Sequence, residues 1–140
     1  MGKKSAVRDL ADTEARAIIR NLRISPQKLN LVAEQIRGKP VQRALMDLEF
    51  SRRRISGAVK AGLESAIANA ENNHELVADE LTIKEATVGD GPTFKRFKPR
   101  ARGSASAIRK RTSHLYIVLT DEEEIPEPRE RSSKPKKRDQ

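Results

Sequence analysis

The sequence contains no cysteine among its 140 residues, which excludes a disulfide framework and any zinc site built on thiolates. Its two histidines, His74 and His114, are far apart in the chain and do not have the spacing of metal ligands. A glycine-rich phosphate-binding loop is also missing. These absences leave no candidate catalytic residue, cofactor or metal site, so the sequence predicts a protein that is not an enzyme.

Long apolar runs are missing as well. The longest, LYIVL at residues 115–119, is far shorter than the roughly 20 residues that a membrane-spanning helix requires. Residues 1–22 start with basic side chains, but acidic residues and arginines interrupt any apolar segment of a secretory signal. We therefore expect no membrane partner, and a protein that is soluble or part of a soluble assembly in a reducing compartment.

Positive charge is in excess and is unevenly distributed. The chain has 29 Lys and Arg residues against 20 Asp and Glu residues, a net charge of +9. Residues 26–92 are nearly neutral, with nine basic and ten acidic side chains, whereas residues 93–111 hold eight basic side chains and no acidic one. For a near-neutral body that carries a positive segment, a polyanion is the first partner to expect.

Three amphipathic helices are predicted in the near-neutral body. The first begins at Ser25 and Pro26, a favourable N-cap and a favourable first helical residue, and ends before Gly38. The third is rich in small residues and ends near Asn72 and Asn73. The apolar residues at helical spacing are Leu29, Val32, Ala33 and Ile36 in the first helix, Val41, Ala44, Leu45 and Leu48 in the second, and Ile55, Val59, Gly62, Leu63, Ala66, Ile67 and Ala70 in the third.

The apolar period changes to two on either side of the basic segment. Leu and Ile alternate with other residues at positions 81–84 and 114–119, as they do in half-buried strands. If both strands pair in the body, the chain between them must leave and return, and a long hairpin is the economical path. We call this predicted hairpin, about residues 89–113, the arm. Gly103, followed by three small residues, marks its turn.

The arm has too few apolar residues to fold by itself. Between Val88 and Ile108 there is no Val, Ile, Leu or Met, so apolar burial cannot offset the entropy of ordering the segment. With about 12 residues in each direction at about 3.3 Å per residue, it would extend on the order of 40 Å from a body of roughly 13 Å radius of gyration. We therefore expect a partner outside the chain to order it.

Residues 15–24, ARAIIRNLRI, fit two patterns. Ile18, Ile19 and Leu22 suit a helix, whereas Ile18, Leu22 and Ile24 fall on one face of a strand. We favour a third strand, which gives a body of the α+β class.

Eight cations of the arm are candidate phosphate contacts, and Phe94 and Phe97 lie among them as candidate stacking surfaces for bases. The alternative is a solvated basic loop or a localisation signal. We favour phosphate contacts, because a free polar loop does not need strands on both sides of it. The eight cations are Lys95, Arg96, Lys98, Arg100, Arg102, Arg109, Lys110 and Arg111.

The start of the first helix is a second candidate site. Residues 25–28, SPQK, could direct amide groups, the Ser25 hydroxyl and the Lys28 side chain at a phosphate, because helix N-termini attract anions. From the residues alone, ordinary N-capping by Ser25 is favoured over phosphate binding. A DNA-binding helix-turn-helix is disfavoured, because its recognition helix, VQRALMDLEF at residues 41–50, has one basic and two acidic side chains.

Three segments, SPQKLNLVAEQIRGKPVQRAL, LESAIANAENN and DGPTFKRFKPRARGSASAIRKRTSH, occur in this order along the chain. Together they resemble the bacterial-type members of the universal large-ribosomal-subunit protein family number twenty-two, over about residues 13–120. The resemblance implies an α+β fold of three helices packed on a small three-stranded antiparallel sheet, with a long extended β-hairpin arm. It also implies a structural constituent of the cytoplasmic ribosome that has no cofactor, binds large-subunit rRNA, supports assembly and lines the peptide exit tunnel.

By position, the resemblance places rRNA contacts at the start of the first helix and along the arm, and a tunnel-lining tip at the turn. The implied partners are several domains of the large-subunit rRNA, neighbouring large-subunit proteins, and the nascent peptide at the tunnel wall. The implied rRNA contacts are Ser25, Gln27, Lys28, Lys95, Arg96, Lys98, Arg100, Arg109, Lys110, Arg111, Thr112 and Ser113. The implied tip is Arg100, Ala101, Arg102, Gly103, Ser104, Ala105 and Ser106.

The composition of the two ends predicts the domain organisation. We expect a flexible head at residues 1–12, a single α+β domain with its arm at 13–120, and a disordered charged tail at 121–140. Two rival functions remain open at this stage. One is a DNA-binding or nucleoid protein that uses the same charge, and the other is an enzyme that acts on RNA or a nucleotide.

Overall fold

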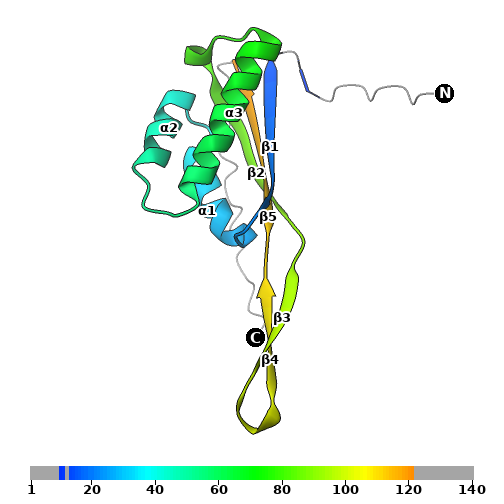
Figure 1. Cartoon of the computed structure of the whole chain (residues 1–140). Helices are drawn as coiled ribbons and strands as arrows, with labels where there is room; N and C mark the ends of the chain where they lie inside the picture. The colour runs from blue at the N-terminus through cyan, green and yellow to red at the C-terminus, as the bar shows by residue number, and fades with distance from the viewer. Residues whose placement is uncertain (1–9, 12, 122–140) are drawn as a thin grey trace, which may run out of the picture.

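The structure is a computed structural model that describes residues 10–11 and 13–121 (Figure 1). Almost all of the predicted head and tail therefore lie outside the described residues. The elements, in chain order, are β1 (Glu14–Leu22), α1 (Pro26–Ile36), α2 (Val41–Glu49), α3 (Ser56–His74), a short 3-10 turn η1 (Ala78–Glu80), β2 (Thr82–Asp90), β3 (Phe94–Pro99), a second 3-10 turn η2 (Ala101–Gly103), β4 (Ala105–Lys110) and β5 (Ser113–Thr120).

The strands form two antiparallel sheets, as the predicted fold class requires. The body sheet has the order β1-β5-β2, and β3 pairs with β4 in a separate two-stranded ribbon. The ribbon extends away from the body at the end of β2 and the start of β5 (Figure 1). The prediction of an α+β fold with three helices, a three-stranded sheet and a hairpin arm is confirmed. Most of the ambiguous segment 15–24 belongs to strand β1 and not to a helix.

The core lies between the helices and one face of the body sheet. Helix α3 packs on β1 and β5, α1 packs on β2, and α2 packs against α3 (Figure 1). The predicted apolar stripes account for most of this core, since Leu29, Val32, Val59 and Leu63 are fully buried. Ile67 is only partly buried at the edge of the cluster. The sheet contributes Ile83, Leu115, Ile117 and Leu119, also fully buried.

The predicted buried face of β1 is wrong at Ile18, which is 36% exposed. Ala15, Ala17 and Ile19 face the helices instead. Leu22 does pack against the core, because the register with β5 shifts between Ile19 and Leu22 and Asn21 adopts a φ of 59°. An irregularity of this kind moves the following side chains to the other face of a strand, and simple alternation does not anticipate it.

Gly62 allows α3 to approach β1 closely, and this contact yields a stability prediction. A Cβ at Gly62 would overlap the Ile19 side chain, whereas a Cβ at Gly57 of the same helix would meet no atom within 4 Å. We expect Gly62→Ala to destabilise the fold, because overpacking a core costs about 1–3 kcal/mol. Gly57→Ala is the matched control and should be neutral or stabilising by up to about 1 kcal/mol. Thermal unfolding of both variants tests this, and equal stabilisation of both would contradict it.

Candidate nucleic-acid interface

The arm presents nearly all of its side chains to solvent. Strands β3 and β4 pair from Phe94 with Lys110 to Pro99 with Ala105. Every residue from 92 to 111 is exposed except Ser106, which is half-buried. The arm is therefore held by backbone pairing and has no hydrophobic core of its own, in agreement with its composition.

Two buried hydroxyl groups hold the base of the arm. Thr112 Oγ1 donates a 2.7 Å hydrogen bond to the Pro92 carbonyl, and Ser113 Oγ donates a 3.1 Å hydrogen bond to the Ile24 carbonyl. Both side chains are almost fully buried, at 2% and 0% exposure. The Thr112 hydroxyl thus links the two strands at the base of the arm, and the Ser113 hydroxyl fixes that base to the segment between β1 and α1.

The start of α1 lies beside the base of the arm. Ser25 occupies the N-cap position with extended backbone, but its side chain makes no capping hydrogen bond. The first turn closes instead on its main-chain carbonyl, which accepts from the amides of Lys28 and Leu29 at 3.1 Å each. The hydroxyl of Ser25 is therefore not used for N-capping, which the residues alone had favoured.

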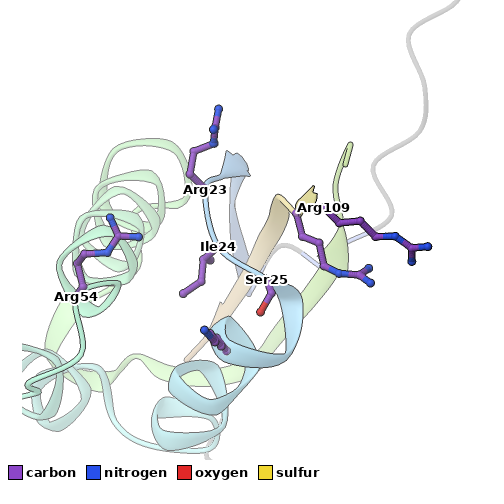
Figure 2. Close-up of a pocket in the computed structure, with 7 residues that line it drawn as sticks. Arg23, Ile24, Ser25, Arg54 and Arg109 are labelled. Atoms are coloured by element: carbon purple, nitrogen blue, oxygen red, sulfur yellow. The ribbon is translucent and has the colours of Figure 1, made fainter. Parts of the chain in front are cut away.

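A pocket of about 530 Å³ opens between the start of α1, the base of β4 and the segment that leads into α3 (Figure 2). Five of its seven lining residues are cationic, and none is acidic. We call it the cationic pocket, and it is lined by Arg23, Ile24, Ser25, Lys28, Arg54, Arg109 and Arg111. Like charges gathered in one concave site repel one another, and an anion placed among them relieves that repulsion.

The pocket joins parts of the chain that are far apart in sequence. Ser25 and Lys28 come from α1, and Arg109 comes from β4, so four of the predicted contacts, Arg111 included, meet at one site. Figure 2 shows the Ser25 hydroxyl and the side chain of Arg109 on neighbouring walls of this site. The arrangement can bind a phosphate group by charge, with a hydroxyl available for a hydrogen bond.

Comparison with known proteins identifies the family. A family model described as "Ribosomal protein L22p/L17e" matches residues 17–120. The chain belongs to this family. It is 63% identical over 124 residues to the large ribosomal subunit protein uL22 of Mesorhizobium japonicum, covering 89% of this chain and 96% of that protein. It is 61% identical over 121 residues to the protein of the same name from Rhizobium etli, covering 86% and 94% respectively.

Membership in the L22p/L17e family gives the general function. The chain is a structural, non-enzymatic protein of the large ribosomal subunit, and its place is the ribosome of the cytoplasm. Within residues 10–11 and 13–121, no group of three or more His, Cys, Asp or Glu side chains could hold a metal ion. No helix of that same part of the chain is long and apolar enough to cross a membrane.

Sequence reasoning missed two of the cations that this L22p/L17e chain brings to the pocket. Arg23 and Arg54 line it beside the predicted residues. Arg54 ends a run of three arginines that could have drawn attention to it, whereas Arg23 is a single cation in the bend between β1 and α1 and gives no such signal. Gln27, a predicted contact, is exposed on α1 but does not line the pocket.

The other predicted cations lie along the arm, outside the pocket. They are Lys95, Arg96, Lys98, Arg100, Arg102 and Lys110, all exposed. The two phenylalanines among them differ in their surroundings. The guanidinium of Arg23 lies 5.3 Å from the centroid of the Phe94 ring and that of Arg96 lies 6.0 Å from it, whereas Phe97 is 75% exposed.

The tip of the arm is a small hydrogen-bonded turn. The Arg100 amide donates to the Ser104 carbonyl at 2.8 Å, and the Ser104 hydroxyl donates to the Ala101 carbonyl at 2.9 Å. Arg102 and Gly103 both have positive φ, 58° and 69°. Glycine adopts this conformation without a steric penalty, which explains the predicted turn at Gly103; Arg102 was not predicted to adopt it.

Proposed function

We propose that this chain binds large-subunit rRNA through the cationic pocket and the arm, supports assembly of the subunit, and lines the peptide exit tunnel with the tip of the arm. The observation that carries the proposal is the continuity of positive charge from the pocket to the arm. Arg109 and Arg111 line the pocket and also belong to the arm, so one backbone path of an RNA could follow both.

Two kinds of contact support the proposal. In the pocket, cations from α1, β4 and three connecting segments surround a site in which an RNA phosphate would be neutralised from several sides. Along the arm, the exposed cations Lys95, Arg96, Lys98, Arg100 and Lys110 have no ion pair with an acidic side chain in the part of the chain that the structure describes. Phosphates of a surrounding RNA would supply the missing negative charge.

The proposal divides the arm between two tasks. The shaft, by which we mean the residues of the arm on either side of the tip, 89–99 and 107–113, anchors the chain on rRNA. Residues 100–106 at the tip form part of the tunnel wall and face the nascent peptide. Apart from Arg100 and Arg102, the tip has only small side chains, which suit a wall better than an anchor. The proposed partners also include neighbouring large-subunit proteins and several rRNA domains. The proposed domain organisation has a head at residues 1–12 and a tail at 121–140.

Competition binding tests the proposal against the rival DNA-binding function. Purified full-length chain is mixed with labelled large-subunit rRNA, and unlabelled rRNA or duplex DNA of equal nucleotide content is added at several salt concentrations. We expect folded rRNA to compete at much lower concentration than duplex DNA, because the pocket and the arm present cations from several separate segments, which a folded RNA can contact together. Equal competition at physiological salt would overturn the proposal in favour of general binding to nucleic acids.

A further inference from the structure

The register of the arm places one like-charge pair beside an exposed aromatic ring. Lys95 is directly opposite Arg109, and Phe97 is directly opposite Ala107. Residues two apart in a strand lie on the same face, so Lys95, Arg109 and Phe97 share one face of the ribbon. The next pair on that face, Pro99 with Ala105, is uncharged.

The pair of cations is unfavourable in the isolated chain. Like charges directly opposite each other on a strand pair are destabilising. Within the described residues, no acidic side chain forms an ion pair with Lys95 or Arg109. A single anion between the two side chains would turn this repulsion into two charge-assisted contacts.

The backbone of Phe97 lies about 7 Å further along the strand than that of Lys95, the rise of two residues, and its side chain is on the same face. It is 75% exposed, and on the side away from Lys95 and Arg109 its neighbours on that face are alanine and proline side chains that carry no charge. Phe94 lies on the opposite face by the same alternation and already has two guanidinium groups near its ring. Phe97 is therefore the aromatic face that is open on the arm.

We propose that this face of the arm is a subsite for one unpaired nucleotide of RNA, with its phosphate between Lys95 and Arg109 and its base stacked on Phe97. The inference rests on the proposed binding of rRNA and specifies part of it. The cations beside the ring favour a nucleotide over an apolar peptide, because a peptide would leave Lys95 and Arg109 unneutralised. Arg109 also lines the cationic pocket, so the subsite continues the same RNA path.

Substitutions of Phe97 by alanine and leucine distinguish base stacking on its ring from other contacts of its side chain. Base stacking on an aromatic side chain is sequence-tolerant, and its removal typically weakens binding about 5- to 150-fold. We expect this loss for both Phe97→Ala and Phe97→Leu in the full chain with large-subunit rRNA, and near wild-type binding for Phe97→Tyr. The salt dependence should stay unchanged in all three, whereas Lys95→Gln combined with Arg109→Gln should lower its slope by roughly 0.7–0.9, the value for one lost phosphate.

Fluorescence reports the stacking directly, because the chain has no tryptophan. Phe97→Trp introduces a single indole at the subsite, and its emission should be quenched when protein-free large-subunit rRNA is added. Val77→Trp is the control: Val77 is 57% exposed in the connection that follows α3, outside both the arm and the cationic pocket, so its emission should change little.

The outcomes distinguish the subsite from the proposed function. If wild-type chain binds rRNA but Phe97→Ala binds equally well and the indole of Phe97→Trp is not quenched, the subsite is wrong and rRNA binding stands. If Phe97→Leu binds like wild type while Phe97→Ala is weak, the face makes an apolar contact, as with a protein, and base stacking is again wrong. If wild-type chain does not bind rRNA, the proposed function itself fails.

Discussion

Replacing Lys95, Lys98 and Lys110 by glutamate is expected to weaken binding to large-subunit rRNA by several orders of magnitude. Each cation lost from a phosphate contact should lower the slope of log affinity against log salt by roughly 0.7–0.9, so three contacts should lower it by about 2 to 3. Glutamate adds repulsion from the phosphates, which deepens the loss of affinity. Filter binding across a salt series measures both quantities.

The matched control replaces the same three lysines by glutamine. It removes the contacts without adding repulsion, so the slope should fall as much as in the glutamate variant, while affinity falls less. All three side chains are exposed, and the body should melt at the wild-type temperature in both variants. A wild-type salt slope in either variant would show that the arm cations do not contact phosphates.

Leu63→Asp is expected to unfold the body. Leu63 is fully buried in α3 against the sheet, and an unpaired carboxylate there would cost several kcal/mol as an order-of-magnitude estimate. Domains of this size are typically stable by about 5–15 kcal/mol, so one such change removes much of the total. Circular dichroism during thermal unfolding measures it. A soluble variant that melts cooperatively near the wild-type temperature would contradict the assigned core.

Two further substitutions in α3 test how the effect depends on burial. The sequence pattern puts Ile67 on the same stripe as Leu63, but Ile67 is only partly buried, so Ile67→Asp should cost less. Ala68 is exposed one position further on, and Ala68→Asp should cost only the loss of helix propensity, up to about 0.7 kcal/mol. The order Leu63, Ile67, Ala68 in decreasing cost is the expected result.

The regular elements could be predicted because their signals are local. The stripe of Leu29, Val32, Ala33 and Ile36 between a Ser-Pro start and a glycine is sufficient to define α1, and all four residues are buried. Alternation at residues 81–84 and 114–119 similarly marks β2 and β5. The arm could be predicted because two strands lie on either side of a segment that cannot form a core.

The parts that sequence reasoning missed depend on contacts between distant segments. Ser25 looked like an N-cap, but capping depends on side-chain rotamer, and its hydroxyl does not cap the helix. The hydrogen bonds of Thr112 and Ser113 reach the carbonyls of Pro92 and Ile24, 20 and 89 positions away in the chain, so no local pattern indicates them. Arg23 joins the pocket only because the start of α1 lies beside the arm, which no local pattern encodes.

Incorporation into the large subunit tests most directly whether the shaft of the arm is the anchor and its tip the wall. Tagged full-length chain, the triple glutamate variant and a variant with residues 102–105 removed are each expressed, and the amount that sediments with the large subunit is measured. We predict near wild-type incorporation of the tip-shortened chain and a large loss for the glutamate variant. Full incorporation of the glutamate variant, together with exclusion of the tip-shortened chain, would contradict the account.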